Sequence, residues 1–205
     1  MNTNLAYQED YWQDWKDSPR TELINGKIVA MSPRPAINHL FVASNIYTIF
    51  DQYLRGKRCT PFADGADLYL TEKDYFIPDM MVVCDPDKIR HDGVHGTPDL
   101  VVEVLSPSTA KRDMTYKKAV YEQCGVREYW IVHPLERMIQ QYLLQEEDGK
   151  RRLVLANIYT QYPDYLLEKL TEEERAALVT EFPCGIFDDL TVRLEDVFRR
   201  VLSVP

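Results

Sequence analysis

Hydrophobic and polar positions follow two different periods in the first half of the chain. In residues 36–54 the apolar positions recur every three or four residues, which predicts a helix. Residues 21–31 (TELINGKIVAM) predict a β-hairpin, because Asn25-Gly26 readily adopts the positive φ angles of a two-residue turn. The other elements predicted here are a short amphipathic helix at residues 8–16 and strands at residues 58–62, 67–71 and 76–84.

The second half of the chain contains one unusual apolar run. Residues 98–109 (PDLVVEVLSPST) predict a buried strand bounded by turn residues, yet Glu103 stands inside it. A helix is predicted over residues 111–124, ended by Gly125, and residues 85–97 are polar and loop-like. The remaining elements are strands at residues 128–132, 138–144 and 152–159, then a helical segment, a final strand and a C-terminal helix. This order predicts an α/β fold with a mixed β-sheet flanked by helices, an N-terminal hairpin and additional C-terminal strands.

Composition is that of a soluble globular protein. The 205 residues are 45% hydrophobic and 28% charged, so we expect a single domain with one substantial core. No apolar stretch approaches the roughly 20 residues of a membrane helix, and the acidic, aromatic N-terminus is not a secretion signal. The four cysteines are scattered without a CxxC pair. We therefore expect reduced thiols and a cytoplasmic location.

The net charge of −9 changes the range of possible partners. Domains that coat nucleic acid by charge alone are usually basic, so that class is disfavoured. Two local basic clusters remain, and each is either a nucleic-acid contact or a solvated helix end or face. They are formed by Arg55, Lys57 and Arg58, and by Lys111, Arg112, Lys117 and Lys118.

Two acids in apolar strands carry the candidate chemistry. Asp79 follows Pro78 in FIPDMMVV, and Glu103 lies in PDLVVEVLSP. One buried acid can be a satisfied structural residue, but two acids on neighbouring strands repel each other unless a cation lies between them. Oxygen ligands of this kind suit Mg²⁺ or Mn²⁺. Such a metal polarises a phosphoryl oxygen and lowers the pKa of bound water, which is the chemistry of phosphodiester hydrolysis.

These residues resemble the PD-(D/E)XK nuclease superfamily and, more closely, a large bacterial family of restriction endonucleases within it. The similar segments are TELINGKIVAMSP, IPDMMVV, PDLVVEVLSPST, RDMTYKKAVYEQCGVREYWIVHP and LTVRLEDVF, which together span most of residues 20–200. The resemblance implies a restriction endonuclease-like fold, with a nuclease core at about residues 20–160 and a C-terminal extension at about 161–205. It also implies that Asp79, Glu103 and the backbone carbonyl of Val104 bind the metal.

The superfamily's lysine is displaced in this chain. It normally stands two residues after the second acid, where this sequence has Leu105. In the closer family the lysine lies in the next helix, which corresponds here to Lys117. Asp113, Lys117 and Tyr121 are four residues apart and share a helix face, so Lys117 can reach the acids and stabilise a charged transition state. The alternative is a surface ion pair between Asp113 and Lys117.

Three further residues have candidate roles. Glu22 matches an early acid of the closer family and is either a metal ligand or a solvated strand end. His39 matches a family position at the start of the helix, where it either contacts phosphate or is structural. We assign Lys118, together with His39, to substrate binding.

Two function classes follow. The first is a metal-dependent endonuclease that hydrolyses DNA, with Asp79 and Glu103 holding Mg²⁺ or Mn²⁺ and Lys117 assisting. The second is a catalytically inactive nuclease fold that binds nucleic acid or a protein partner, which the acidic charge and the displaced lysine favour. A two-carboxylate glycoside hydrolase is set aside, because the chain lacks the length and aromatic loops of a sugar cleft. We expect a homodimer, since two-fold symmetry matches the symmetry of duplex DNA.

Overall fold

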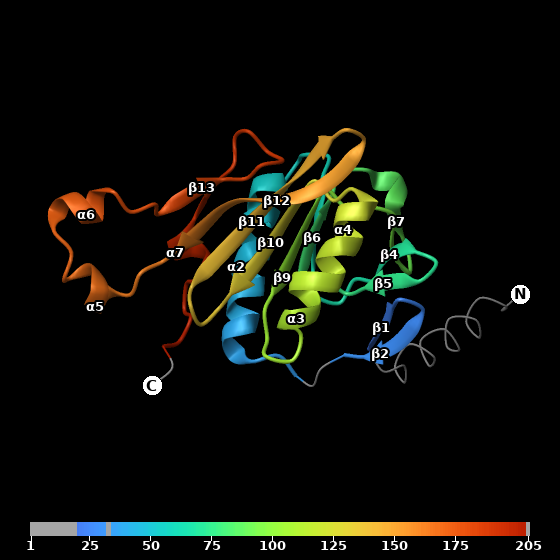
Figure 1. Cartoon of the computed structure of the whole chain (residues 1–205), viewed down its shortest axis with the longest axis horizontal. Coiled ribbons are helices and arrows are strands. Elements are labelled where there is room, and N and C mark those ends of the chain that lie inside the picture. The colour runs from blue at the N-terminus through green and yellow to red at the C-terminus, as the bar shows by residue number, and fades with distance from the viewer. Residues whose placement is uncertain (1–19, 32–33, 204–205) are drawn as a thin grey trace, which may run out of the picture.

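A mixed six-stranded sheet forms the centre of the molecule in the computed structural model, which describes residues 20–31 and 34–203 (Figure 1). The strand order is β12-β11-β10-β9-β6-β3. Only β9 and β10 are parallel, and the other neighbours are antiparallel. The strands are β3 (Thr60–Ala63), β6 (Met80–Val83), β9 (Leu100–Val104), β10 (Glu128–His133), β11 (Met138–Glu147) and β12 (Lys150–Thr160).

A second six-stranded sheet begins with the predicted hairpin. Asn25 and Gly26 have φ angles of 51° and 74°, so this turn has the positive φ values that the sequence predicted. The sheet order is β2-β1-β5-β4-β8-β7. Its strands are β1 (Thr21–Ile24), β2 (Lys27–Ala30), β4 (Leu68–Thr71), β5 (Asp74–Phe76), β7 (Ile89–Arg90) and β8 (Gly93–His95).

Helices cover the two faces of the central sheet. On one face α2 (Ile37–Leu54) packs Val42, Ile46 and Phe50 against the strands. On the other face lies a continuous helical segment, made of α3 (Ala110–Arg112), the π-helical turn η2 (Asp113–Lys117) and α4 (Lys118–Cys124). Gly125 ends it with a φ angle of 89°. Within the described part of the chain, none of the helices is both long and apolar enough to cross a membrane.

The C-terminal part adds short elements and contributes to the α2 side of the core. Phe182, Val192, Val197 and Phe198 are buried there. The elements are α5 (Asp164–Leu167), α6 (Glu172–Ala176), β13 (Glu181–Pro183), β14 (Thr191–Arg193) and α7 (Leu194–Val197). The predicted α/β fold with a hairpin and additional C-terminal strands is confirmed, whereas the helix predicted at residues 8–16 lies outside the described residues.

Two local predictions were wrong. The strand predicted at residues 76–84 is broken at residues 77–79, because β5 and β6 belong to different sheets. Pro78 lies in this break, where its lack of an N–H removes no ladder hydrogen bond. The loop predicted at residues 85–97 contains the 3₁₀ turn η1 (Pro86–Lys88) and the short strands β7 and β8.

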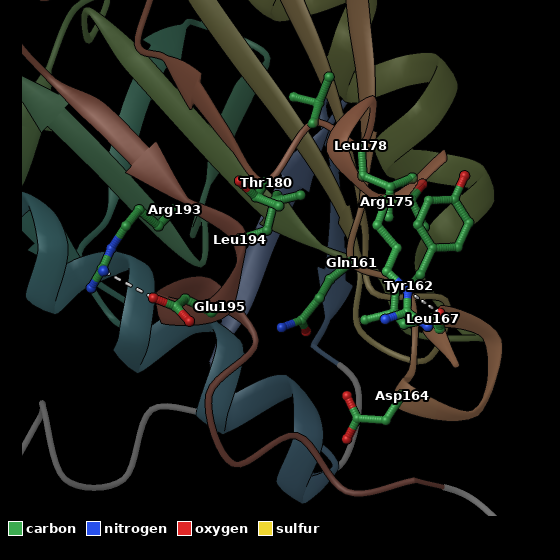
Figure 2. Close-up of a pocket in the computed structure, with 12 residues that line it drawn as sticks. Gln161, Tyr162, Asp164, Leu167, Arg175, Leu178, Thr180, Arg193, Leu194 and Glu195 are labelled. Carbon is green, nitrogen blue, oxygen red and sulfur yellow. Dashed lines mark hydrogen bonds and ion pairs between the residues drawn. The ribbon is translucent and has the colours of Figure 1, made fainter. Parts of the chain in front are cut away.

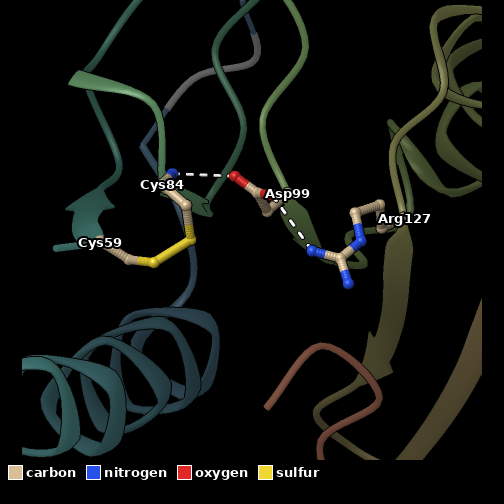
Figure 3. Close-up of a disulfide and its surroundings, with 4 residues drawn as sticks. All are labelled: Cys59, Cys84, Asp99 and Arg127. Carbon is tan, nitrogen blue, oxygen red and sulfur yellow. Dashed lines mark hydrogen bonds and ion pairs between the residues drawn. A yellow bond between two sulfur atoms is a disulfide. The ribbon is translucent and has the colours of Figure 1, made fainter. Parts of the chain in front are cut away.

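The expectation of four reduced thiols was also wrong, because Cys59 and Cys84 form a disulfide (Figure 3). Antiparallel pairing of β3 with β6 sets Thr60 opposite Val83, so the next residues outward face each other. This register is set by tertiary structure, so the spacing of the cysteines along the sequence does not predict the disulfide. The Cys84 N–H donates to Asp99 at 2.8 Å, and Asp99 also pairs with Arg127. Cys124 and Cys184 are free thiols.

Candidate active site

The predicted acids meet where β6 begins and β9 ends. Because these strands are antiparallel, with Met80 opposite Val102, the residue before β6 lies beside the end of β9. The Val104 N–H donates a 2.6 Å hydrogen bond to Asp79 Oδ2. Asp79, Glu103 and Val104 all line one cavity of about 400 Å³. The strand register thus brings both acids into a single site.

Glu103 faces the helical segment rather than α2. Its neighbours Val102 and Val104 belong to the core on the α2 side, whereas Val101 and Leu105 belong to the core beneath α4. Successive side chains of a strand point to opposite faces, so Glu103 shares the α4 face. Leu105, at the usual lysine position, is a buried core residue.

Lys117 supplies the missing ammonium from the π-helical turn η2. Its Nζ lies 2.8 Å from Glu22 Oε1, 3.0 Å from Glu103 Oε1 and 3.5 Å from Asp113 Oδ1. The Lys117 side chain is only 4% exposed. The alternative of a surface ion pair with Asp113 was therefore wrong, because both residues are buried. Single π-helical turns occur frequently at functional sites, and this one contains both Asp113 and Lys117.

Glu22 is a buried anchor rather than a solvated strand end. Its side chain is 1% exposed, and Oε1 accepts the Ile77 N–H as well as Lys117. Arg112 approaches Oε2 at 3.4 Å. Donors thus occupy both oxygens of Glu22, as they do those of Asp79, so Glu22 holds Lys117 in place, and its metal-ligand role stays a prediction.

His39 reaches the site from the first turn of α2, on the opposite side of the sheet. Its Nε2 lies 3.2 Å from Asp79 Oδ1. Burial alone would lower the pKa of His39, but the hydrogen bond to Asp79 and the negative charge of Asp79 outweigh it, so the pKa is raised. His39 Nδ1 is buried without a hydrogen-bond partner among the described residues.

Lys118 lies away from this cavity. Its Nζ donates to the Leu153 carbonyl of β12 at 2.9 Å and lies 4.7 Å from the centre of the Tyr142 ring. Neighbouring helix residues point in different directions, so Lys117 and Lys118 do not share a target. The position of Lys118 gives no support to the substrate-binding role predicted for it.

The cluster carries excess negative charge. Glu22, Asp79, Glu103 and Asp113 surround one another, and Lys117 and Arg112 are the permanent cations that pair with them. Burial raises the pKa of Glu103 well above its ordinary value, Lys117 opposes this rise, and the charges of the other three acids add to it. The four carboxylates outnumber Lys117 and Arg112, and the raised pKa of Glu103 shows that ionising all four is unfavourable in this structure. A divalent cation would offset this excess of negative charge.

The oxygen donors also fit Mg²⁺ or Mn²⁺, which need only one or two carboxylates plus a carbonyl, water or phosphate. Asp79 and Glu103 supply carboxylates at the cavity, and Val104 lines it beside them. Across the described residues, no group of three or more His, Cys, Asp or Glu side chains is placed to hold a metal. The residues present therefore fit a site completed by backbone or solvent oxygens, and not a closed cage of side chains.

Several residues around the cavity were missed or given no role by the sequence analysis. Tyr121 is fully buried, and its hydroxyl donates to Glu103 Oε1 at 2.8 Å, beside the bond from Lys117. Arg20 and Arg34 line the cavity itself, Arg20 from the segment before the hairpin and Arg34 from the segment before α2. The four-residue spacing of Lys117 and Tyr121 pointed to a shared face, but no local signal pointed to Arg20 or Arg34.

A family model described as "Putative restriction endonuclease" and named Uma2 matches residues 8–180. The chain belongs to the Uma2 family. Among curated proteins, it is 34% identical over 118 residues to the uncharacterized protein slr1290 of Synechocystis sp. (strain ATCC 27184 / PCC 6803 / Kazusa). That match covers 55% of this chain and 60% of the cyanobacterial protein, which is less than two thirds of its length.

Among solved structures, this Uma2 chain resembles the crystal structure of a protein described as a "putative nuclease belonging to DUF820" from Anabaena variabilis ATCC 29413. The TM-score is 0.66 at 19% sequence identity, and the superposition covers 94% of this chain and 98% of the other. At this identity the likeness concerns the fold. It confirms the restriction endonuclease-like architecture that the sequence motifs predicted.

Proposed function

We propose that this Uma2 protein is a metal-dependent endonuclease that hydrolyses phosphodiester bonds of DNA. The observation that carries the proposal is the convergence of Asp79, Glu103 and Lys117 in one cavity, although they come from three separate elements. Family membership and the nuclease-like fold support the same reaction class. Mg²⁺ or Mn²⁺ is the proposed cofactor, with Asp79, Glu103 and the Val104 carbonyl as its ligands.

Each residue of the cavity has a distinct proposed task. A bound divalent cation would polarise the phosphate and lower the pKa of an attacking water. Lys117, held by Glu22, places a fixed positive charge beside Glu103, where it stabilises negative charge that develops on the phosphate. Tyr121 fixes the Glu103 carboxylate through its hydrogen bond. His39 orients Asp79 through Nε2.

DNA as the substrate rests on local charge rather than on the net charge of −9. Arg20, Arg34 and Arg112 line the same cavity as the acids. Arginine donors bind phosphate oxygens in a fork-like geometry, so these residues are suited to the backbone on either side of the scissile bond. Binding there requires Arg20 to exchange its ion pair with Asp64, and Arg112 its contact with Glu22, for phosphate oxygens. Cleavage of both strands of a duplex commonly uses two active sites, which a two-fold pair of this chain would provide.

A second candidate function is binding of nucleic acid or of a protein partner without cleavage. The specific observation in its favour is that Lys117 already contacts three carboxylates. A buried ion-pair cluster of this kind can exist for structural reasons alone. The two candidates differ in one property, because only hydrolysis requires Asp79 and Glu103 to act on a bound metal.

A plasmid-nicking assay distinguishes them. We expect the purified chain to nick supercoiled DNA with Mg²⁺ or Mn²⁺ and not with EDTA, and we expect Asp79→Ala and Glu103→Ala to abolish nicking. Asp87→Ala, an exposed acid near the end of β6, is the matched control and should retain activity. Because host nucleases contaminate such preparations, only activity that the acid substitutions remove counts. Equal nicking by the wild type and the three variants would refute the proposal. DNA binding that needs no metal, without nicking, would support the second candidate.

A further inference from the structure

A long connecting segment follows β12 and makes little contact with the rest of the molecule. We call residues 161–180 the arm; it contains α5 and α6 and connects β12 to β13. Figure 1 shows the arm extending away from both sheets. None of its residues is buried. It nevertheless exposes large apolar side chains, including Tyr165, which is 62% exposed, and Val179, which is 54% exposed.

The arm has a defined internal structure in spite of this exposure. Thr171 and Glu174 form a capping box at the start of α6, and Arg175 Nε donates to the Leu167 carbonyl at 2.7 Å. A cavity of about 510 Å³ separates the base of the arm from the body. Figure 2 shows Leu167 and Leu178 of the arm on one side of this cavity and Leu194 of α7 on the other. Ordering a residue costs roughly 1–2 kcal/mol, so a segment without buried residues needs a surface to pack against.

The strand before the arm is exposed too. β12 lies at the edge of the central sheet, where its outer side has no neighbouring strand in the sheet order. Val154, Leu155 and Ile158 are each at least 40% exposed, and Ile158 is 47% exposed. Long edge strands with apolar side chains readily associate with another chain. Part of the edge is covered, because Lys118 and Glu122 bind the backbone of Leu153. The uncovered part begins after Leu153 and continues into the arm.

Charge identifies the partner of this surface. The arm is acidic, with Asp164, Glu168, Glu172, Glu173 and Glu174 against Lys169 and Arg175. Such a segment repels nucleic acid. The first three residues of β12 are the cations Lys150, Arg151 and Arg152, and all three are exposed. The basic residues at the start of β12 thus precede the exposed apolar residues of that strand, and the acidic arm follows them.

We propose that β12 and the arm form the interface with a second copy of this chain. A two-fold axis through the stretch at residues 155–158 sets the two β12 strands antiparallel, so the end of each strand lies beside the start of the other. The acidic arm of each copy then lies against Lys150 and Arg151 of the other, so the pair contains this contact twice. Leu155 and Ile158 of both copies meet at the axis. The arm and the exposed residues of β12 amount to roughly the 20–30 residues a side that a specific interface uses.

Charge reversal tests this pairing. One variant carries Glu168→Lys and Glu173→Lys in the arm, which leaves the capping residue Glu174 intact. The other carries Lys150→Glu and Arg151→Glu, and the only ion pair described for these two residues, Arg151 with Glu146, is exposed on both sides. We expect light scattering coupled to gel filtration to give a dimer for the wild type and monomers for both variants. The matched control, Glu72→Lys with Asp188→Lys, reverses two exposed acids outside the interface and should remain a dimer.

Mixing the two monomeric variants provides the decisive result. In a mixed pair the basic arm of one variant meets the acidic strand of the other, and the second contact joins the unchanged acidic arm to the unchanged basic strand. We therefore expect the mixture to form dimers, as should a single chain that carries all four substitutions. Leu155→Asp should give monomers without rescue by any charge variant. A monomeric wild type, dimers in both reversal variants, or failure of the mixture to associate would each overturn the proposal.

Discussion

Replacing Lys117 by Met tests whether its ammonium neutralises the buried acids. The Lys117 Nζ lies within 3.5 Å of Glu22, Glu103 and Asp113, and the side chain is 4% exposed. Met has a similar length and fills the same space, so the change removes the charge and leaves little cavity. Arg112, at 3.4 Å from Glu22, is then the remaining permanent cation in contact with the cluster.

The expected loss of stability is large. Removing one partner of a buried ion pair costs about 3–5 kcal/mol, because the remaining charge stays buried without compensation. With a urea m-value of about 2–3 kcal/mol per molar, this corresponds to a fall of roughly 1–2.5 M in the unfolding midpoint. The loss should shrink in mild acid. Burial and the neighbouring acids raise the pKa of Glu103, so the folded variant takes up a proton there and relieves the repulsion.

Urea unfolding followed by tryptophan fluorescence measures this loss, and Lys118→Met is the matched control. Lys118 is the next residue, and its ammonium bonds to a backbone carbonyl instead of to acids. Its replacement should cost no more than about 1.5 kcal/mol. Equal costs for the two substitutions at neutral pH would show that Lys117 does not neutralise the cluster.

Three further results are expected from stability measurements. Burial and neighbouring acids raise the pKa of Glu103, so the free energy of unfolding of the wild type should increase as pH falls through that pKa. Glu103→Gln should lack this increase, and identical pH profiles of stability for the two proteins would contradict the reasoning. The pKa of His39 is raised, so the stability that its charge contributes is fully present below about pH 6.5 and is lost as pH rises through the raised pKa; His39→Gln should therefore destabilise more in acid than in alkali, and an equal loss at both would contradict this. Replacing Cys59 and Cys84 by Ser should cost about 3.5 kcal/mol from the entropy of the loop that the disulfide closes, a loss that Cys124→Ser should not reproduce.

The sequence predicted the parts of the site that depend on local periodicity. Alternation along a strand identifies Glu103 as the interruption in an apolar run, and four-residue spacing aligns Lys117 with Tyr121. The assignment of Asp79 came from the resemblance of several motifs to the family, because the Pro78-Asp79 dipeptide alone is too common to identify a site. These residues meet because β6 and β9 are antiparallel neighbours and the helical segment crosses above β9.

Features set by tertiary structure could not be predicted. The disulfide depends on the register of β3 with β6, and the burial of Glu22 depends on how the second sheet folds against η2. The sequence also grouped Lys118 with Lys117, but β12 returns beside α4 and binds the Lys118 ammonium. In each case the partner lies more than twenty residues away along the chain, beyond the reach of any local pattern.

Titration of the protein with Mn²⁺ in a calorimeter tests the central claim most directly, because it measures the metal site without depending on a DNA substrate. We expect one binding event in the wild type and in Asp87→Ala, and none in Asp79→Ala or Glu103→Ala. Unchanged Mn²⁺ affinity in both Asp79→Ala and Glu103→Ala would contradict the assignment of these two acids as the ligands of a catalytic metal.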